Sequence, residues 1–285
     1  MNSLEETKQI LKMYNIRANK NLGQNFLISD EVIETIVESA DIHEQDLVIE
    51  IGPGLGTLTK KLLEKAGKVI CIELDEKMIK ILKQRFITSK NLQIINDDIL
   101  KVDLNKIIKE ENRPCKVVAN LPYYITTPII MKLLEEKLDI ESITVMIQKE
   151  VAERLIAAPG SKNTGAITYA IDYYCETEKI IEVPNTSFIP EPKVTSEVIK
   201  LKIRDKENIN VINKEVMFRV IKSAFMQKRK TLLNALTNAK VFVSKEEGIE
   251  VLKNMNLSEN VRAEELSLQQ FADISNYIVN NIKKQ

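Results

Sequence analysis

The sequence has no tryptophan and one histidine among its 285 residues, and it holds only eight glycines and eight prolines. So little glycine and proline excludes a collagen-like or low-complexity chain. No apolar run approaches the roughly 20 residues of a membrane-spanning helix. The first 20 residues lack the apolar centre of a secretion signal, and Glu5 and Glu6 argue against a transit peptide. We therefore expect a globular, cytoplasmic protein without a membrane partner.

Cysteine is also scarce, and its spacing is uninformative for metal binding. Cys71, Cys115 and Cys175 lie far apart and form no C-x-x-C pair, and His43 is the sole histidine. Such a set predicts neither a disulfide framework nor a zinc site. We expect buried free thiols in a reducing compartment and no metal.

Net charge is absent as well, because 41 basic residues balance 41 acidic ones. A surface for nucleic acid would therefore have to come from an uneven distribution of charge. The hydrophobic fraction of 44% is sufficient for a substantial core.

Short apolar runs alternate with amphipathic segments in the first two thirds of the chain. The runs, which predict strands, are 47–51, 68–74, 91–96, 116–120 and 143–148. A helix is expected over 30–40 with Asp30 as its N-cap, and Asp75 is expected to cap another. This alternation predicts an α/β fold with a parallel, doubly wound sheet.

The last third of the chain has a different pattern. Residues 164–203 favour strands, 204–213 are polar, and beyond them only helical periodicity is found. The helical segments are 214–225, 227–239, 245–255 and 267–282. We expect one domain over 1–203 and a small all-helical domain over 204–285.

The segment EIGPGLG, residues 50–56, follows the first expected strand and precedes a helix. Glycines at such a turn let a ligand approach the backbone. The acid Glu73 follows Gly52 by 21 residues, at the end of the next strand, where its carboxylate suits ribose hydroxyls. The pattern favours a nucleoside cofactor over a turn without a ligand, and by itself it would also serve NAD.

Asp97 and Asp98 end the third expected strand. Ligands of open α/β sheets lie beyond the carboxyl ends of strands, so one of the two could accept a hydrogen bond from an adenine amine. A turn or a helix cap is the alternative, and the sequence leaves both open.

The most specific segment is NLPYY, residues 120–124, after the fourth expected strand. The N6 amine of adenine is a weak nucleophile, and the amide oxygen of Asn120 and the carbonyl of Leu121 could hold it for methyl transfer. Pro122 stiffens the turn, and Tyr123 offers a face on which the base can stack. The alternative is an Asn-x-Pro turn with a core tyrosine.

With these segments in place, the sequence resembles the small-subunit ribosomal RNA adenine N6-dimethyltransferases, the kasugamycin-sensitivity family. The resemblance covers most of the chain in order. It is carried by LGQNFL (22–27), EIGPGLGTLT (50–59), IELD (72–75), NDDIL (96–100), NLPYYITTP (120–128), QKEVAERL (148–155), PGSKNTGAIT (159–168), FIPEPKVTSEV (188–198) and AFMQKRKTLLNAL (224–236).

The resemblance implies a Rossmann-like class I methyltransferase that uses S-adenosylmethionine. It implies dimethylation of two adjacent adenosines in a hairpin near the 3′ end of 16S RNA, with a role in small-subunit biogenesis. The implied cofactor-binding residues are Asn25, Leu27, Gly52, Glu73, Asp98 and Asn120. The implied catalytic residues are Asn120, Leu121, Pro122, Tyr123 and Phe188, where Phe188 is a second stacking face or, equally, a core residue.

Basic residues concentrate in 214–240, where seven cations face one acid, a balance of 7 − 1 = +6. Residues there that we expect to contact RNA phosphates are Arg219, Lys222, Lys228, Arg229 and Lys230. A solvated surface is the alternative. A second cluster, formed by Lys8, Lys12, Arg17 and Lys20, could close over RNA or cofactor.

Three other functions compete with this one. A large-subunit methyltransferase conferring macrolide resistance shares the glycine turn and the Asn-x-Pro-Tyr segment, but FIPEPKV and FMQKRKT favour the small-subunit family. An NAD-dependent dehydrogenase lacks support, because the spacing is not G-x-G-x-x-G. A non-catalytic assembly factor stays possible as an added role. We expect the partner to be small-subunit ribosomal RNA or the assembling small subunit, and the protein to be a monomer.

Overall fold

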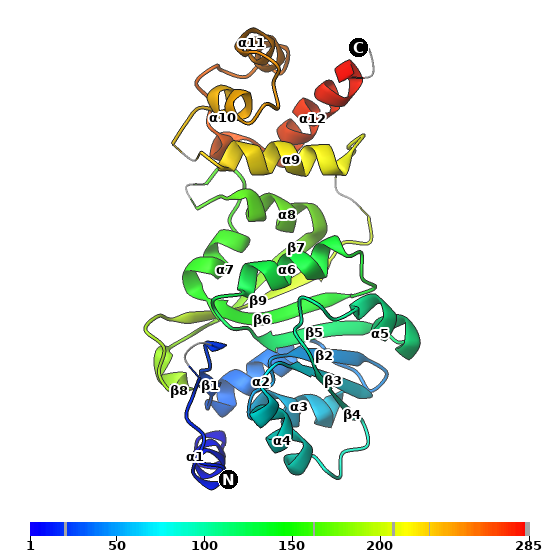
Figure 1. The fold of residues 1–285 in the computed structure, drawn as a ribbon, viewed down its shortest axis with the longest axis vertical. Coiled ribbons are helices and arrows are strands. Elements are labelled where there is room, and N and C mark those ends of the chain that lie inside the picture. Colours follow the sequence, from blue (N-terminus) through cyan, green and yellow to red (C-terminus); the bar gives the residue numbers. More distant parts are fainter. Residues whose placement is uncertain (20–21, 162, 207–208, 228, 283–285) are drawn as a thin grey trace. The chain divides into compact units, whose positions relative to one another are not determined.

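The computed structural model describes residues 1–19, 22–161, 163–206, 209–227 and 229–282 (Figure 1). The chain forms two compact units, one of residues 1–152 and 177–203 and the other of residues 153–176 and 204–285. The sequence predicted a single division at Ile203. The structure differs because a segment inside the predicted first domain packs with the C-terminal helices, where Tyr169 and Tyr173 are buried.

The first unit is built on a seven-stranded sheet with the order β4-β3-β2-β5-β6-β9-β7. Its strands are β2 (Leu47–Ile51), β3 (Lys68–Glu73), β4 (Leu92–Asn96), β5 (Cys115–Asn120), β6 (Ser142–Gln148), β7 (Cys175–Val183) and β9 (Ser196–Ile203). Strands β4, β3, β2, β5 and β6 are parallel, and β9 pairs antiparallel with β6. The α/β prediction and all five predicted strands are confirmed.

Helices alternate with these strands. They are α1 (Ser3–Met13), α2 (Asp30–Ser39), α3 (Thr57–Lys65), α4 (Glu76–Arg85), α5 (Leu104–Glu111), α6 (Thr126–Glu135) and α7 (Lys149–Leu155). Asp75 caps α4 as predicted, accepting from the Lys77 N–H at 2.9 Å. The cap of α2 is Ser29 and not Asp30, whose carboxylate instead accepts from the Ser3 N–H at 3.2 Å.

The apolar faces of α2 and α3 pack on one face of the sheet. This cluster includes Ile36 and Leu62 from the helices and Val48, Val118 and Met146 from the strands, all fully buried. All five residues of β2 are buried, as expected for a central parallel strand covered on both faces. A short ladder joins β1 (Phe26–Leu27) to β8 (Phe188–Ile189), which follows a 3-10 turn, η2 (Asn185–Ser187).

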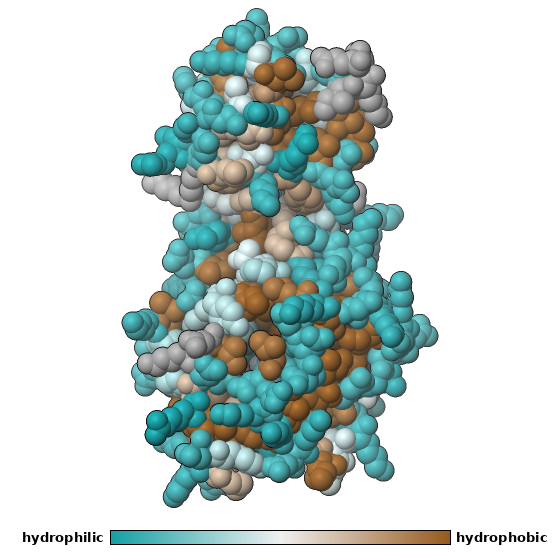
Figure 2. Space-filling view, in the orientation of Figure 1, coloured by the Kyte–Doolittle hydropathy of each residue, from teal (hydrophilic) through white to brown (hydrophobic). Residues whose placement is uncertain are grey.

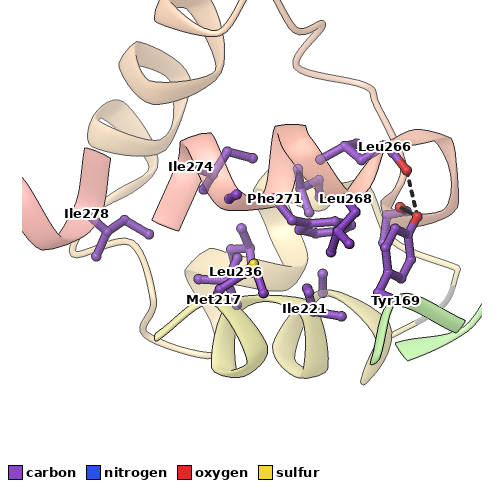
Figure 3. Close-up of a cluster of buried hydrophobic side chains, with 14 of the residues drawn as sticks. Tyr169, Met217, Ile221, Leu236, Leu266, Leu268, Phe271, Ile274 and Ile278 are labelled. Carbon is purple, nitrogen blue, oxygen red and sulfur yellow. Dashed lines mark hydrogen bonds between the residues drawn. The ribbon is translucent and has the colours of Figure 1, made fainter. Parts of the chain in front are cut away.

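The second unit is helical. It contains α8 (Ala166–Tyr174), α9 (Lys214–Phe225), α10 (Leu232–Asn238), α11 (Lys245–Asn254), η3 (Ala263–Glu265) and α12 (Leu268–Ile282). Figure 3 shows its core, where Phe271 of α12 packs edge-on against Tyr169 of α8 with ring centroids 4.9 Å apart. The buried Tyr169 hydroxyl donates to the Leu266 carbonyl at 2.7 Å, which satisfies its only donor. The predicted strand character around 164–174 is wrong, because this apolar segment forms α8.

Hydrophilic side chains cover most of the face seen in Figure 2, with hydrophobic ones showing in smaller areas among them. Among the described residues, no helix combines the length and the hydrophobicity needed to cross a membrane. The three cysteines are buried and unpaired, as the sequence predicted.

Candidate active site

A pocket opens where four strands end. Because β4, β3, β2 and β5 are parallel, their carboxyl ends meet at one edge, and the chain order reverses between β2 and β5. Ligands of open α/β sheets bind at such a switch point. The pocket encloses about 1090 Å³, its open mouth included. Nine of the residues predicted from the sequence line it, namely Asn25, Leu27, Gly52, Glu73, Asp98, Asn120, Leu121, Pro122 and Tyr123.

The glycine turn between β2 and α3 needs glycine at two positions in particular. Gly52 has φ +67°, and a Cβ built there would lie 3.9 Å from the Pro122 Cδ, so its left-handed backbone and not a clash favours glycine. Gly56 has φ +81°, and a side chain there would come within 2.7 Å of Leu82 and Phe86. These left-handed conformations disfavour other residues. The glycines therefore set the conformation of the turn, and Leu82 and Phe86 pack closely against it at Gly56.

Glu73 lies at the end of β3 with only 8% of its surface exposed. Its Oε2 accepts from the Gly54 N–H at 3.1 Å, and its Oε1 accepts from the Asp75 N–H at 2.8 Å. Burial raises the pKa of Glu73, and these hydrogen bonds partly oppose that rise. Each carboxylate oxygen can accept a further bond, so the group fits a partner with two hydroxyls.

Asp98 forms a turn and also lies in the pocket lining. Its Oδ1 accepts from the Leu100 N–H at 3.0 Å, and its own N–H donates to Asp97 at 2.7 Å, which is the geometry of a turn. Both aspartates also line the pocket. A turn of this kind can present a carboxylate to a ligand, so the two roles that the sequence left open are compatible.

The loop after β5 is held at three points. The Leu121 N–H donates to the Met146 carbonyl at 3.1 Å, and the Ile125 N–H donates to the Pro122 carbonyl at 3.2 Å. The Asn120 Nδ2 donates to the Asn25 carbonyl at 3.3 Å. Because the nitrogen of this amide faces Asn25, its Oδ1 is the atom that can accept from an amine.

The two predicted aromatic faces differ in placement. Tyr123 is half-buried in the pocket wall, and its hydroxyl lies 2.6 Å from the Ser196 Oγ. Burial raises the pKa of Tyr123, so the phenol stays neutral. Phe188 is 1% exposed, pairs with Leu27 across the β1–β8 ladder, and is not among the lining residues. It is placed as a core phenylalanine, and a stacking role for it stays a prediction.

The N-terminal helix α1 contacts the elements around the pocket through an acid, Glu6, whereas the sequence predicted only that basic residues of this segment could close over RNA or cofactor. The Glu6 Oε1 lies 2.5 Å from the Arg85 Nη2, and the Glu6 Oε2 lies 3.3 Å from the Lys60 Nζ. Arg85 also donates to the carbonyl of Leu55 in the glycine turn. Gln24, on the segment after α1, donates to Asp75 at 2.9 Å. The amphipathic pattern of residues 3–13 could have predicted the helix, but not these partners.

A buried acid in the pocket lining was also missed. Glu50, 1% exposed, accepts from the Thr59 hydroxyl at 2.6 Å and from the Cys71 Sγ–H at 3.4 Å. Burial raises the pKa of Glu50 to about 7, more than these hydrogen bonds lower it. The sequence indicated this residue only as a single acid within the apolar strand 47–51.

The basic residues predicted to contact RNA belong to the second unit. Arg219 and Lys222 are exposed and three residues apart on α9, so they share a face of that helix. Arg229 and Lys230 are exposed after the end of α9, and Lys228 lies outside the described residues. In the part of the chain that the structure describes, no cluster of three or more potential metal ligands is found.

The chain matches the family model described as ribosomal RNA adenine dimethylase over residues 15–280. It is 48% identical to the ribosomal RNA small subunit methyltransferase A of Alkaliphilus metalliredigens, covering 96% of each chain. It is 46% identical to the protein of that name from Clostridioides difficile, covering 98% of this chain and 96% of the other.

Solved structures agree with this match. A dimethyladenosine transferase from Plasmodium falciparum superimposes with a TM-score of 0.75 at 28% identity, covering 91% of this chain and 98% of that one. The 23S rRNA methyltransferase ErmE superimposes with a TM-score of 0.69 at 23% identity, covering 90% and 100%, which shows the fold alone. The chain therefore belongs to the ribosomal RNA adenine dimethylase family, whose members are S-adenosylmethionine-dependent methyltransferases of the class I, Rossmann-like fold.

Proposed function

We propose that this enzyme dimethylates the N6 amines of two adjacent adenosines in a hairpin near the 3′ end of 16S ribosomal RNA. The observation that carries the proposal is the orientation of the Asn120 amide, whose nitrogen is bonded to Asn25 at 3.3 Å inside the pocket of the glycine turn. The names of the relatives, which specify the small ribosomal subunit, support this RNA as the substrate.

The pocket residues fit S-adenosylmethionine. The glycine turn leaves room for the backbone to approach the ligand, and Glu73 would accept from the ribose hydroxyls. Asp98 would accept from the adenine amine, while Asn25 and Leu27 would line the remaining wall. When bound, this cofactor supplies an electrophilic methyl group on a positively charged sulfur.

The chain's own part in the reaction is to position the target amine. The Asn120 Oδ1 would accept one N–H of the adenine amine and the Leu121 carbonyl the other, and the Tyr123 ring would stack on the base. Pro122 keeps this loop stiff. On receiving the methyl group, the amine nitrogen would carry a positive charge, which it would lose by releasing a proton to water. No strong base is needed.

Beyond the pocket, we propose that Arg219, Lys222, Arg229 and Lys230 position the RNA through its phosphates. Lys228 belongs to the same proposal. We also propose that the helical unit binds the assembling small subunit and that the enzyme acts in the cytoplasm as a monomer. The exposure of Arg219, Lys222, Arg229 and Lys230 and the excess of positive charge in 214–240 support the proposed phosphate contacts.

A methyl-transfer assay with labelled S-adenosylmethionine tests the function. The substrates are small-subunit particles and large-subunit RNA from cells that lack these modifications, and the product nucleosides are identified by mass spectrometry. We expect N6,N6-dimethyladenosine from the small-subunit particle alone. The same product from large-subunit RNA alone would favour the macrolide-resistance function. No product from either would contradict the proposal.

A further inference from the structure

The loop that carries Tyr123 presents a second tyrosine in a different way. The hydrogen bond from the Ile125 N–H to the Pro122 carbonyl, at 3.2 Å, closes a tight turn with Tyr123 and Tyr124 at its two central positions. Tyr123 is half-buried and bonded to Ser196. Tyr124 also lines the pocket, but 58% of its surface is exposed. Its hydroxyl makes no hydrogen bond to any described residue.

Although exposed, the Tyr124 ring is supported on one side by Gly23. A Cβ built on Gly23 would lie 3.3 Å from the Tyr124 Cδ1 and 3.6 Å from the Cε1, so a larger residue there would press on the ring. Gly23 has φ +60°, and its carbonyl accepts from the Asn25 Nδ2 at 3.1 Å. The ring is therefore seated on the same segment that orients Asn120.

Folding alone gives little reason for this arrangement. A tyrosine with more than half of its surface in water contributes only part of the apolar burial that an aromatic side chain can offer. An enzyme that acts on the exocyclic amine of a base in RNA must separate that base from its neighbours. The separation leaves the face of the neighbouring base unstacked, just outside the pocket. An exposed aromatic ring at the mouth can replace the lost stacking.

We propose that Tyr124 is a positioning residue that stacks on the nucleotide next to the target adenosine while the target base lies against Tyr123. This inference rests on the proposed function, since it requires an RNA substrate. Paired in this way, the two central residues of one turn hold two successive bases. Tyr124 then sets how tightly the enzyme holds its RNA and not how fast the methyl group is transferred.

The test measures kcat and KM with small-subunit particles for the wild type, Tyr124→Ala and Tyr124→Phe. We expect Tyr124→Ala to raise KM for the particle at least fivefold, with kcat changed less than twofold, because a stacked base is lost. Tyr124→Phe should stay within twofold of the wild type, since the ring and not the hydroxyl is used. The control Ile87→Ala, at a side chain 82% exposed and outside the pocket lining, should match the wild type.

A second substrate makes the test specific. Particles are reconstituted with RNA that carries an abasic site on the 5′ or the 3′ side of one target adenosine. One of these substrates should raise the KM of the wild type as much as Tyr124→Ala raises it for the intact particle. Combining that substrate with the variant should raise KM no further. If the increases in KM caused by the abasic site and by the variant multiplied when combined, the inference would be overturned. An unchanged KM for Tyr124→Ala would also overturn it.

Two further outcomes separate the inference from its premise. If Tyr124→Ala raised the Kd for S-adenosylmethionine and left the RNA KM unchanged, the ring would belong to the cofactor site and the inference would fail. If the wild type methylated neither particles nor RNA, the proposed function itself would fail, and that result does not depend on Tyr124.

Discussion

The pocket edge of the sheet and the core of the helical unit bury polar groups for different purposes. In the helical core, the buried Tyr169 hydroxyl lies in a largely apolar cluster and donates to the Leu266 carbonyl at 2.7 Å. At the pocket edge, the polar atoms of Glu73 and Asn120 are bonded on one side and still able to bond a ligand on the other. The first arrangement stabilises the fold, whereas the second prepares a site. Substitutions in the two regions should therefore affect different measurements.

The largest effect is expected in the helical core. Phe271→Ala removes a fully buried ring that packs on Tyr169, and such truncations cost about 3–5 kcal/mol. Urea unfolding should show this loss, while the Kd for S-adenosylmethionine stays within twofold of the wild type. Val243→Ala, at a side chain 86% exposed in the same unit, is the control. A cofactor Kd that rose with the loss of stability would break the separation between the two regions.

At the pocket edge, Asn120→Ala should remove the acceptor for the target amine. By analogy with the loss of one preorganised hydrogen-bonding group in an active site, we expect kcat to fall about 100- to 1000-fold. Unfolding free energy should change by less than about 1 kcal/mol, since the lost bond is long, at 3.3 Å. Single-turnover methyl transfer and particle binding are measured together, with Asn234→Ala on α10 as the control. If Asn120→Ala still transferred the methyl group, the proposed role of Asn120 would be contradicted. If the variant no longer bound the particle, Asn120 would have a structural role instead.

Glu50, in the lining of the same pocket, should make the free energy of unfolding depend on pH. Its pKa rises from 4.5 to about 7 on folding, so the folded state favours the protonated form. The contribution is fully present below pH 4.5 and is lost as the pH rises through 7, a change of about 3 kcal/mol. Glu50→Gln, neutral at every pH, should remove this change. Unfolding free energies of variant and wild type at pH 5 and pH 8 test it, against Glu31→Gln at an exposed site.

The smallest effect is expected on the surface of the helical unit. Arg219→Gln together with Lys222→Gln should reduce the slope of log affinity for the particle against log salt by about two, one for each phosphate contact. The cofactor Kd and the unfolding free energy should not change, because both side chains are exposed. Lys253→Gln on α11 is the control. An unchanged slope would assign these cations to a solvated surface, the alternative that the sequence left open.

Sequence patterns located most of the pocket because its residues follow buried strands. Glu73 and Asn120 end apolar runs, and parallel strands bring such ends to one edge. The environment of Phe188 was harder to predict, because the sequence around an aromatic residue before a proline-rich loop does not indicate whether it faces a ligand or the core. The antiparallel ladder with Leu27 places Phe188 in the core, while its stacking role stays a prediction, and that pairing joins residues 161 positions apart.

By itself, the sequence determined the α/β class, the glycine turn, the acid after the second predicted strand and the Asn-Leu-Pro-Tyr loop. These features are local, since propensity and spacing over a few residues specify them. Only the tertiary structure decided that Arg85 connects Glu6 to the Leu55 carbonyl, that Asn25 orients Asn120, and that residues 153–176 join the helical unit. Each of these depends on side chains or segments brought together from distant parts of the chain, where burial and hydrogen bonding are settled by packing and not by sequence spacing.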